Sequence, residues 1–253
     1  MSGRLEGTVA LITGASSGIG EATALALGAE GASLAVAARR VDRLEGLAER
    51  LSGSTRVLVH QVDVSDEDQV RRMVEQTVAE LGRLDTLVNN AGVMLLGPIE
   101  GAPTEEWRRM VGVNFLGLFY CTHAALPHLL AAADGEPRRV ADVVNVSSVA
   151  GRVARRDNAV YSATKFGVGA FSESLRQEVT GRHVRVTVVE PGATRTELAL
   201  QNRPEVLEQM ARTFGRIEML GAEDIANAVA YAVTQPRHAS VNELLVRPTE
   251  QER

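Results

Sequence analysis

The sequence predicts an α/β fold, in which a doubly wound parallel sheet of about seven strands carries helices on both faces and residues 1–253 form a single domain. Short apolar runs rich in β-branched residues alternate with longer helical stretches, which is typical of strand–helix units joined by right-handed crossovers. The first apolar run ends in a glycine-rich turn that leads into a helix. With 253 residues and 45% hydrophobic content, the chain can bury one full core.

Most of the predicted strands are apolar throughout, as expected for strands buried on both faces of a parallel sheet. They cover residues 8–13, 33–38, 56–62, 86–89, 140–146, 184–189 and 243–246. The first predicted helix directly follows the glycine-rich turn. The other predicted helices cover residues 42–51, 66–81, 104–132, about 159–180 and 222–233. Residues 193–221 are predicted to be irregular, with short helical pieces. This order of elements indicates a Rossmann-like sheet.

Composition and charge argue against several classes of function. A net charge of −5 without any block of five or more like charges argues against nucleic acid as the main partner. Cys121 is the only cysteine, which excludes an intrachain disulfide and fits a reducing compartment. The N-terminus is too polar for a signal peptide, and no apolar run reaches the ~18 residues of a membrane helix, so we expect a cytoplasmic protein without a membrane partner. The histidines show no metal-ligand spacing, so no metal site is predicted.

The turn after the first strand predicts a phosphate-binding loop. Residues 13–20 read TGASSGIG, with the glycine spacing G-x-x-x-G-x-G. Glycine permits the tight turn and the close approach of a pyrophosphate to the backbone, and the free N–H groups of the following helix face the anion. The alternative is a glycine-rich turn without a ligand. The predicted contacts are Gly14, Ser16, Ser17, Gly18, Ile19 and Gly20.

A second motif places a phenol and an ammonium group on one face of a helix. Tyr161 and Lys165 are four residues apart within NAVYSATKFG. A nearby ammonium group stabilises a phenolate and brings the pKa of a tyrosine toward neutral pH, so the pair is a candidate for acid–base catalysis. The alternative is an ordinary pair on a solvated helix face.

Taken in order, these motifs resemble the short-chain dehydrogenase/reductase family over nearly the whole chain. The matching positions lie at strand–helix junctions, where such sheets bind ligands. The segments NNAGVMLLGP and ATKFGVGAFSESLRQEV and the tail VNELLVRPTEQER resemble the branch that contains clavulanate dehydrogenase and related NADPH-dependent carbonyl reductases. The matching residues are 13–20, Asp63-Val64, 89–92, Asn114, Ser147-Ser148, Tyr161, Lys165 and 191–196.

The resemblance implies a set of catalytic residues. Ser148 would hydrogen-bond the substrate oxygen, and it is preferred to Ser147 because neighbours on an extended segment point to opposite faces. Tyr161 would donate a proton to the developing alkoxide. Lys165 would hold the nicotinamide ribose and lower the pKa of the tyrosine. Asn114 would support a water that relays protons to Lys165, and its alternative role is to cap backbone groups at a helix irregularity.

The resemblance also implies the remaining cofactor contacts. Asp63 and Val64 would flank the adenine, although Asp63 has an alternative role as a turn residue. The central ribose would lie against the segment after the fourth strand, and the nicotinamide side against the segment after the sixth. Together with Tyr161 and Lys165, these contacts are Asn90, Ala91, Gly92, Pro191, Gly192, Thr194 and Thr196.

The end of the second predicted strand indicates NADP (NADPH) and not NAD. NAD-preferring relatives carry an acidic residue there, whereas this chain has Ala38 followed by Arg39 and Arg40. A guanidinium group at Arg39 can bind a 2′-phosphate through two parallel hydrogen bonds, and Arg40 adds positive charge. The alternative is a pair of solvated arginines, and the basic residue that some NADP-dependent relatives have at the position of Ser17 is absent.

The sequence therefore predicts an NADPH-dependent oxidoreductase that reduces an aldehyde or ketone. The alternatives are NAD(P)⁺-dependent oxidation of a secondary alcohol or hydroxy acid, and a non-catalytic dinucleotide sensor. Apolar stripes on helices 104–132 and 159–180 predict a homotetramer. Residues 193–221 are expected to form a lid over the cofactor and a small-molecule substrate.

Overall fold

The computed structural model describes residues 3–252, except for the side chains at positions 213 and 214. A single seven-stranded sheet forms its centre, in the order β3-β2-β1-β4-β5-β6-β7, and every neighbouring pair is parallel. The predicted fold class is confirmed. The strands are β1 (Val9–Thr13), β2 (Ser33–Ala38), β3 (Val57–Gln61), β4 (Thr86–Asn89), β5 (Ala141–Val146), β6 (Val184–Pro191) and β7 (Glu243–Val246).

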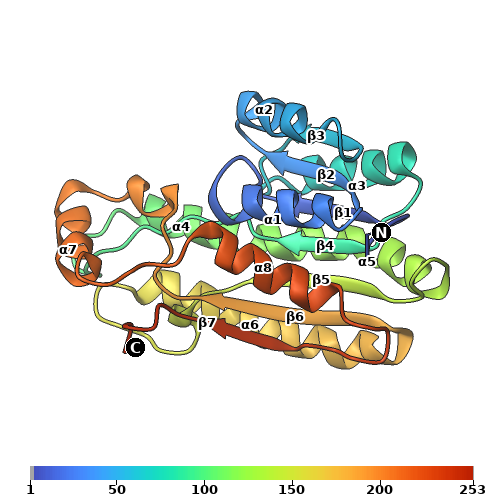
Figure 1. Ribbon diagram of the computed structural model, residues 1–253. Coiled ribbons are helices and arrows are strands. Elements are labelled where there is room, and N and C mark those ends of the chain that lie inside the picture. Colours follow the sequence, from blue (N-terminus) through green and yellow to red (C-terminus); the bar gives the residue numbers. More distant parts are fainter. Residues whose placement is uncertain (1–2, 253) are drawn as a thin grey trace.

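Helices cover both faces of the sheet (Figure 1). One face packs against α1 (Gly18–Ala29), α2 (Val41–Leu51) and α8 (Ala222–Val233), and the other against α3 (Glu67–Leu81), α5 (Gly117–Asp134) and α6 (Ala159–Val179). Consecutive strand residues enter opposite cores, as Leu11 and Ile12 do. Both side chains are fully buried, which explains why β1 is apolar on both faces rather than alternating.

The helix predicted for residues 104–132 is interrupted. It consists of α4 (Thr104–Val111), one turn of π-helix η1 (Gly112–Leu116) and α5, which continues to Asp134. A wide turn of this kind often marks a functional site, and the side chain of Asn114 bonds backbone groups outside the helix here. By length and composition the run Thr104–Asp134 could cross a membrane, but in the structure α5 packs on α3, β4 and β5.

The prediction for residues 193–221 was partly wrong, because this region contains a regular helix. It folds as η4 (Glu197–Gln201) followed by α7 (Pro204–Phe214), beyond the carboxyl ends of the strands (Figure 1). Pro204 occupies the first turn of α7, where proline needs no N–H partner and its fixed φ favours the helix. The two remaining short helices are η2 (Val149–Gly151) and η3 (Thr180–Arg182).

Candidate active site

One cavity of about 1090 Å³ lies at the carboxyl ends of the strands. The chain order reverses between β1 and β4, and this switch point is where open α/β sheets bind ligands. All predicted site residues line the cavity except Gly20 and Asn114. The structure therefore brings together predicted site residues from seven separate segments of the chain.

Thr13, at the end of β1, joins the two segments that flank the switch point. Its hydroxyl oxygen accepts hydrogen bonds from the backbone N–H groups of Asn90 and Ala91, both at 3.1 Å. In return, the Asn90 side-chain amide donates to the carbonyl oxygen of Thr13 at 2.9 Å. The glycine-rich loop and the segment at residues 90–92 are thereby held in a fixed relation across the cavity floor.

The glycine-rich loop fits a dinucleotide pyrophosphate. Gly14 and Gly18 have φ values of +68° and +57°, which glycine adopts readily and other residues rarely do. A Cβ atom on Gly14 would lie 2.8 Å from the Cα of Ala91, and one on Gly20 would lie 2.4 Å from the carbonyl oxygen of Gly14. The loop therefore needs glycine at these positions. Helix α1 begins at Gly18, so its N–H groups and dipole favour an anion at this end of the cavity.

Two arginines line the cavity at the end of β2, as predicted, but their surroundings differ. The guanidinium group of Arg40 contacts the glycine-rich loop: its Nη2 lies 2.8 Å from Ser17 Oγ and 3.0 Å from Ser16 Oγ. Its Nη1 forms an ion pair with Glu197 on η4 at 2.7 Å. Arg39 is exposed, and among the described residues its side chain has no hydrogen-bond or ion-pair partner, so its guanidinium group is free to bind a ligand.

Asp63 and Val64 line the cavity next to the two arginines. The Oδ1 atom of Asp63 accepts hydrogen bonds from the N–H of Ser65 at 3.0 Å and from its hydroxyl at 2.7 Å. Asp63 thus makes the contacts of a turn residue, which was the alternative prediction. Because Asp63 also lines the cavity wall, its contact with the adenine stays a prediction.

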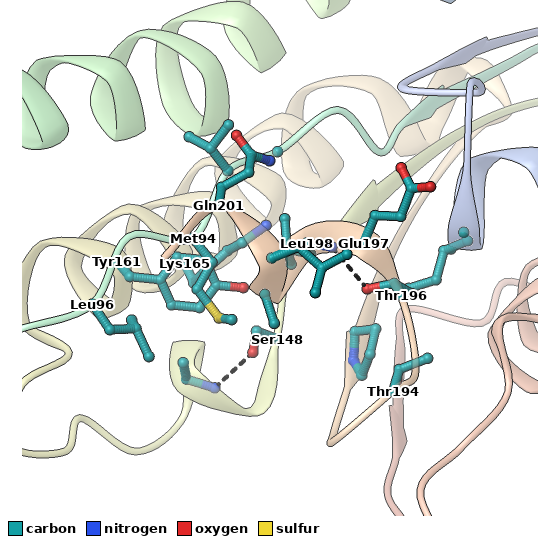
Figure 2. A pocket seen from close by; sticks show the side chains of 18 of the residues that line it. Met94, Leu96, Ser148, Tyr161, Lys165, Thr194, Thr196, Glu197, Leu198 and Gln201 are labelled. Carbon is teal, nitrogen blue, oxygen red and sulfur yellow. Dashed lines mark hydrogen bonds between the residues drawn. The ribbon is translucent and has the colours of Figure 1, made fainter. Parts of the chain in front are cut away.

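The opposite end of the cavity contains Ser148 and Tyr161 (Figure 2). Tyr161 is only 5% exposed. Burial raises the pKa of Tyr161 to about 12, and a hydrogen bond with the side chain of Ser148 opposes this effect. The Ser148 Oγ also accepts a hydrogen bond from the N–H of Ala150 at 3.1 Å. By contrast, the hydroxyl of Ser147 donates to the carbonyl oxygen of Lys165, so that group is already engaged.

Lys165 lies beside Tyr161, with its Nζ 5.8 Å from the centre of the phenol ring. The Nζ donates a hydrogen bond to the carbonyl oxygen of Val146 at 2.8 Å, and burial lowers the pKa of Lys165 to about 8. We expected Lys165 to lower the pKa of Tyr161. In the structure that pKa is raised, because burial outweighs other influences on a phenol that the ammonium group does not contact directly.

Asn114 makes the contacts of its alternative role. Its Oδ1 accepts from the N–H of Val93 at 2.8 Å, and its Nδ2 donates to the carbonyl oxygen of Val93 at 2.8 Å. Nδ2 also lies 3.3 Å from Thr164 Oγ1, one position before Lys165 in the chain. The side chain therefore caps a loop at a helix irregularity, and a proton relay through Asn114 stays a prediction.

Sequence reasoning did not identify the apolar residues around Tyr161. Figure 2 shows Met94, Leu96 and Leu198 beside Tyr161 and Lys165. The loop after Gly92 and the region 193–221, which contain these side chains, were expected to form the substrate pocket, but these segments have no periodic signal that singles out individual residues. One available signal was overlooked, since Lys165 is the only lysine in the chain.

Asn202 joins the region after β6 to the segment that follows β4. Its Oδ1 accepts from the N–H of Leu96 at 2.7 Å, and its Nδ2 donates to the carbonyl oxygen of Met94 at 2.8 Å. Thr196 lies over the glycine-rich loop, where a Cβ on Gly18 would be 3.1 Å from its methyl group. Residues 194–202 therefore cover the cavity at both of its ends. Within residues 3–252, no group of three His, Cys, Asp or Glu side chains could hold a metal ion.

Comparison with known proteins agrees with this geometry. The sequence profile described as short chain dehydrogenase matches residues 8–207. The chain is 38% identical to an uncharacterized oxidoreductase of Staphylococcus saprophyticus, covering 96% of both proteins. It is also 41% identical over 251 residues to glycine betaine reductase ATRR of Emericella nidulans, but it spans only 19% of that protein and 98% of itself.

Solved structures show the same fold. A serine dehydrogenase in its closed form, complexed with NADP⁺, superposes with a TM-score of 0.87 at 31% identity and covers 97% of both chains. An alcohol dehydrogenase from the archaeon Thermococcus sibiricus, complexed with 5-hydroxy-NADP, has a TM-score of 0.85 at 29% identity, over 97% of this chain and 98% of the other.

Proposed function

The chain belongs to the short-chain dehydrogenase/reductase family, and from this premise we propose that it is an NADPH-dependent enzyme that reduces an aldehyde or ketone to an alcohol. The observation that carries the proposal is the state of Tyr161. Its phenol lines the cavity in hydrogen-bond contact with the side chain of Ser148 and is protonated at neutral pH, so a proton donor is in place where the substrate would bind.

NADPH would supply a hydride to the carbonyl carbon. As that bond forms, the electron pair of the C=O double bond moves to oxygen, and the hydroxyl of Ser148 donates a hydrogen bond to the developing charge. Tyr161 then transfers its phenolic proton to the same oxygen, which completes the alcohol. Lys165 would hold the nicotinamide ribose, and its low pKa of about 8 suits a group that exchanges protons near neutral pH.

Several features of the cavity support NADPH. The residue at the end of β2 is Ala38 and not an acid, and Arg39 has a free guanidinium group at the cavity wall. Two solved relatives carry NADP⁺ or an NADP derivative. A 2′-phosphate would meet the free guanidinium group of Arg39, whereas the ribose hydroxyl of NADH would find no acidic side chain at the end of β2.

The direction of the reaction is the main alternative. One structural relative is a serine dehydrogenase, so oxidation of a hydroxy acid is the second candidate. The apolar side chains of Met94, Leu96 and Leu198 around Tyr161 favour an uncharged carbonyl compound over a small anion. A non-catalytic sensor would need no proton donor beside the substrate position.

The experiment that tests the proposal is a substrate panel followed at the absorbance of NADPH. Aliphatic and aromatic aldehydes and ketones are assayed with NADPH, and serine, 3-hydroxy acids and secondary alcohols with NADP⁺. We expect the highest kcat/KM with an apolar aldehyde or ketone. Turnover of hydroxy acids alone would reverse the assignment, and binding of NADPH without turnover of any compound would favour the sensor.

We also infer that the enzyme acts in the cytoplasm as a homotetramer built through α4, α5 and α6. Three side chains of the predicted stripes, Met110, Val168 and Leu175, are buried within the chain itself. Val111 and Phe166, which also belong to the predicted stripes, are exposed at 37% and 45%, and Leu116 in η1 adds to this exposed apolar surface. A monomer mass by light scattering at micromolar concentration would contradict the tetramer, and Phe166→Glu is expected to produce smaller species.

A further inference from the structure

Glu197 is the only acidic residue of η4, and it connects that short helix to the nucleotide-binding loop. Its Oε2 lies 2.7 Å from Arg40 Nη1, and its Oε1 lies 3.5 Å from Arg43 Nη1. The hydrogen bond from Arg40 is the main reason why the pKa of Glu197 is lowered. Figure 2 shows Glu197 on the side of the cavity away from Tyr161, so this carboxylate belongs to the adenosine end of the site.

Every nitrogen of the Arg40 guanidinium group is engaged by these contacts. Nη1 binds Glu197, Nη2 binds Ser16 and Ser17, and Nε lies 3.2 Å from Ser16 Oγ. A phosphate group that approaches Arg40 must therefore displace one of these partners, or bind the guanidinium group together with it. The serine hydroxyls can rotate and donate to a phosphate, whereas a carboxylate can only repel it.

The position of this ion pair matters because Arg40 follows Arg39 and Ala38 at the end of β2, where a dinucleotide places the 2′ position of its adenosine ribose. Arg39 is free to bind a 2′-phosphate, but the second positive charge is neutralised by Glu197. The ion pair is partly exposed, at 44% for the Arg40 side chain and 40% for Glu197, so it can exchange partners at low cost.

We propose that Glu197 is a specificity-determining residue, whose carboxylate competes with the 2′-phosphate of the cofactor for Arg40 and so restrains the preference for the phosphorylated dinucleotide. This inference rests on the proposed use of NADPH. Because Glu197 lies on η4, binding of the phosphate to Arg40 also releases one tether between η4 and the glycine-rich loop.

The test measures binding without any turnover. Isothermal titration calorimetry with 2′,5′-ADP and with 5′-AMP isolates the 2′-phosphate, since the two probes differ only in that group. In Glu197→Gln we expect the Kd for 2′,5′-ADP to fall about two- to fivefold, the range of a partly exposed ion pair, while the Kd for 5′-AMP stays the same.

Two control variants test whether Glu197→Gln acts through Arg40. Glu205→Gln removes the same charge from α7 in the same cavity, but Glu205 pairs with Arg203 and not with Arg40, so its Kd for 2′,5′-ADP should not change. In an Arg40→Ala background, Glu197→Gln should also lose its effect, because the shared partner is absent.

The outcomes separate this inference from the proposed function. If the wild-type enzyme prefers 2′,5′-ADP over 5′-AMP and Glu197→Gln leaves that ratio unchanged, Glu197 is only a tether and the inference is overturned. An equal fall in the Kd for 2′,5′-ADP in Glu205→Gln would also overturn the inference, because the effect would then come from the net charge of the cavity. If neither the wild type nor Glu197→Gln distinguishes the probes, the proposed cofactor choice itself fails.

Discussion

The two ends of the cavity are built in different ways. At the catalytic end, Tyr161 and Lys165 are 5% and 6% exposed, and Lys165 is anchored to a backbone carbonyl of β5. At the adenosine end, Arg39 is exposed, and Arg40 and Glu197 keep 44% and 40% of their side-chain surface exposed while contacting other side chains. One end is fixed by the core, and the other is held by exchangeable surface contacts.

This difference has a physical consequence. Fixed, buried dipoles are effective at stabilising charge that develops in a transition state, because they need not reorganise during the reaction. Exposed charges are screened by water and contribute less each, yet they can be replaced without disturbing the core. We therefore expect substitutions at the catalytic end to abolish the reaction, and substitutions at the adenosine end to change the choice of cofactor while the reaction continues.

The largest effect is expected from Tyr161→Phe. The variant keeps the buried ring but loses the proton donor, so kcat should fall about 10²–10⁴-fold while the Kd for NADPH stays nearly unchanged. Steady-state kinetics and fluorescence titration of NADPH measure the two quantities. Tyr231→Phe, on the exposed surface of α8, is the matched control and should behave like the wild type. A Tyr161→Phe variant that keeps a tenth of the wild-type rate would remove Tyr161 from this role.

The same division explains how much of the molecule could be predicted. The strands, the glycine-rich turn and the positions of Tyr161 and Lys165 follow from local signals, namely apolar runs, glycine spacing and helical spacing. These signals were sufficient because the catalytic end is assembled from the ends of regular elements. The choice of Ser148 and not Ser147 as the substrate-binding hydroxyl stays a prediction, and it is supported by the hydrogen bond that the Ser147 hydroxyl donates to the carbonyl oxygen of Lys165.

The missed features depend on contacts between distant segments. The ion pair of Arg40 with Glu197 joins residues 157 positions apart, and Asn202 contacts a loop more than 100 positions away. No local pattern encodes such pairs. The raised pKa of Tyr161 was missed for a related reason, since it arises from burial by the whole fold and not from the neighbour in the motif.

The next largest effect concerns the cofactor. In the wild type, contacts of the 2′-phosphate with arginine should favour NADPH over NADH by roughly ten- to a hundredfold in kcat/KM. Arg39→Ala should erode this preference, and Ala38→Asp should invert it by adding an acceptor for the ribose hydroxyl and repelling the phosphate. Arg56→Ala, an exposed arginine outside the cavity, is the control. Equal kcat/KM values for the two cofactors in the wild type would contradict the assignment.

A third prediction concerns the protonation of Lys165. Burial lowers its pKa from 10.5 to about 8, so between these values the unfolded chain binds more protons than the folded chain. The contribution of Lys165 to stability should therefore rise with pH in that window, by on the order of 1–2 kcal/mol between pH 8 and 9.5. Two buried groups act in the opposite direction, because burial raises the pKa of Cys121 from 9.0 to about 12 and that of Tyr161 from 10 to about 12. Cys121 opposes the rise already near pH 9, whereas Tyr161 does so only above pH 10.

Because the chain has one lysine, this pKa can be measured directly. Lysine labelled with ¹³C at Cε gives a single side-chain signal, and we expect its midpoint near pH 8. Chemical denaturation of Lys165→Met supplies the control, since this variant should lack the rise in stability between pH 8 and 9.5. A midpoint at the ordinary value of 10.5 would mean that the ammonium group is solvated and that the catalytic end is less rigid than described.

The smallest effect should appear in the backbone of the proposed lid, residues 194–220. This region closes over both ends of the cavity. Its two ends are joined by backbone hydrogen bonds between Arg195 and Leu220 and between Leu220 and Ala193. Contacts to the rest of the chain include side-chain bonds, such as the Arg40 ion pair with Glu197 and the hydrogen bonds of Asn202. Regions held in this way open locally more easily than core helices. NADPH together with the alcohol product should raise hydrogen-exchange protection there by a factor of about ten, or ~1.4 kcal/mol, while amides at 161–175 in α6, which are already protected by the core, serve as the internal control. Equal protection of residues 194–220 with and without these ligands would show that the region is a fixed wall of the cavity. The difference between the rigid catalytic end and the adjustable adenosine end would then involve only the exposed charged side chains.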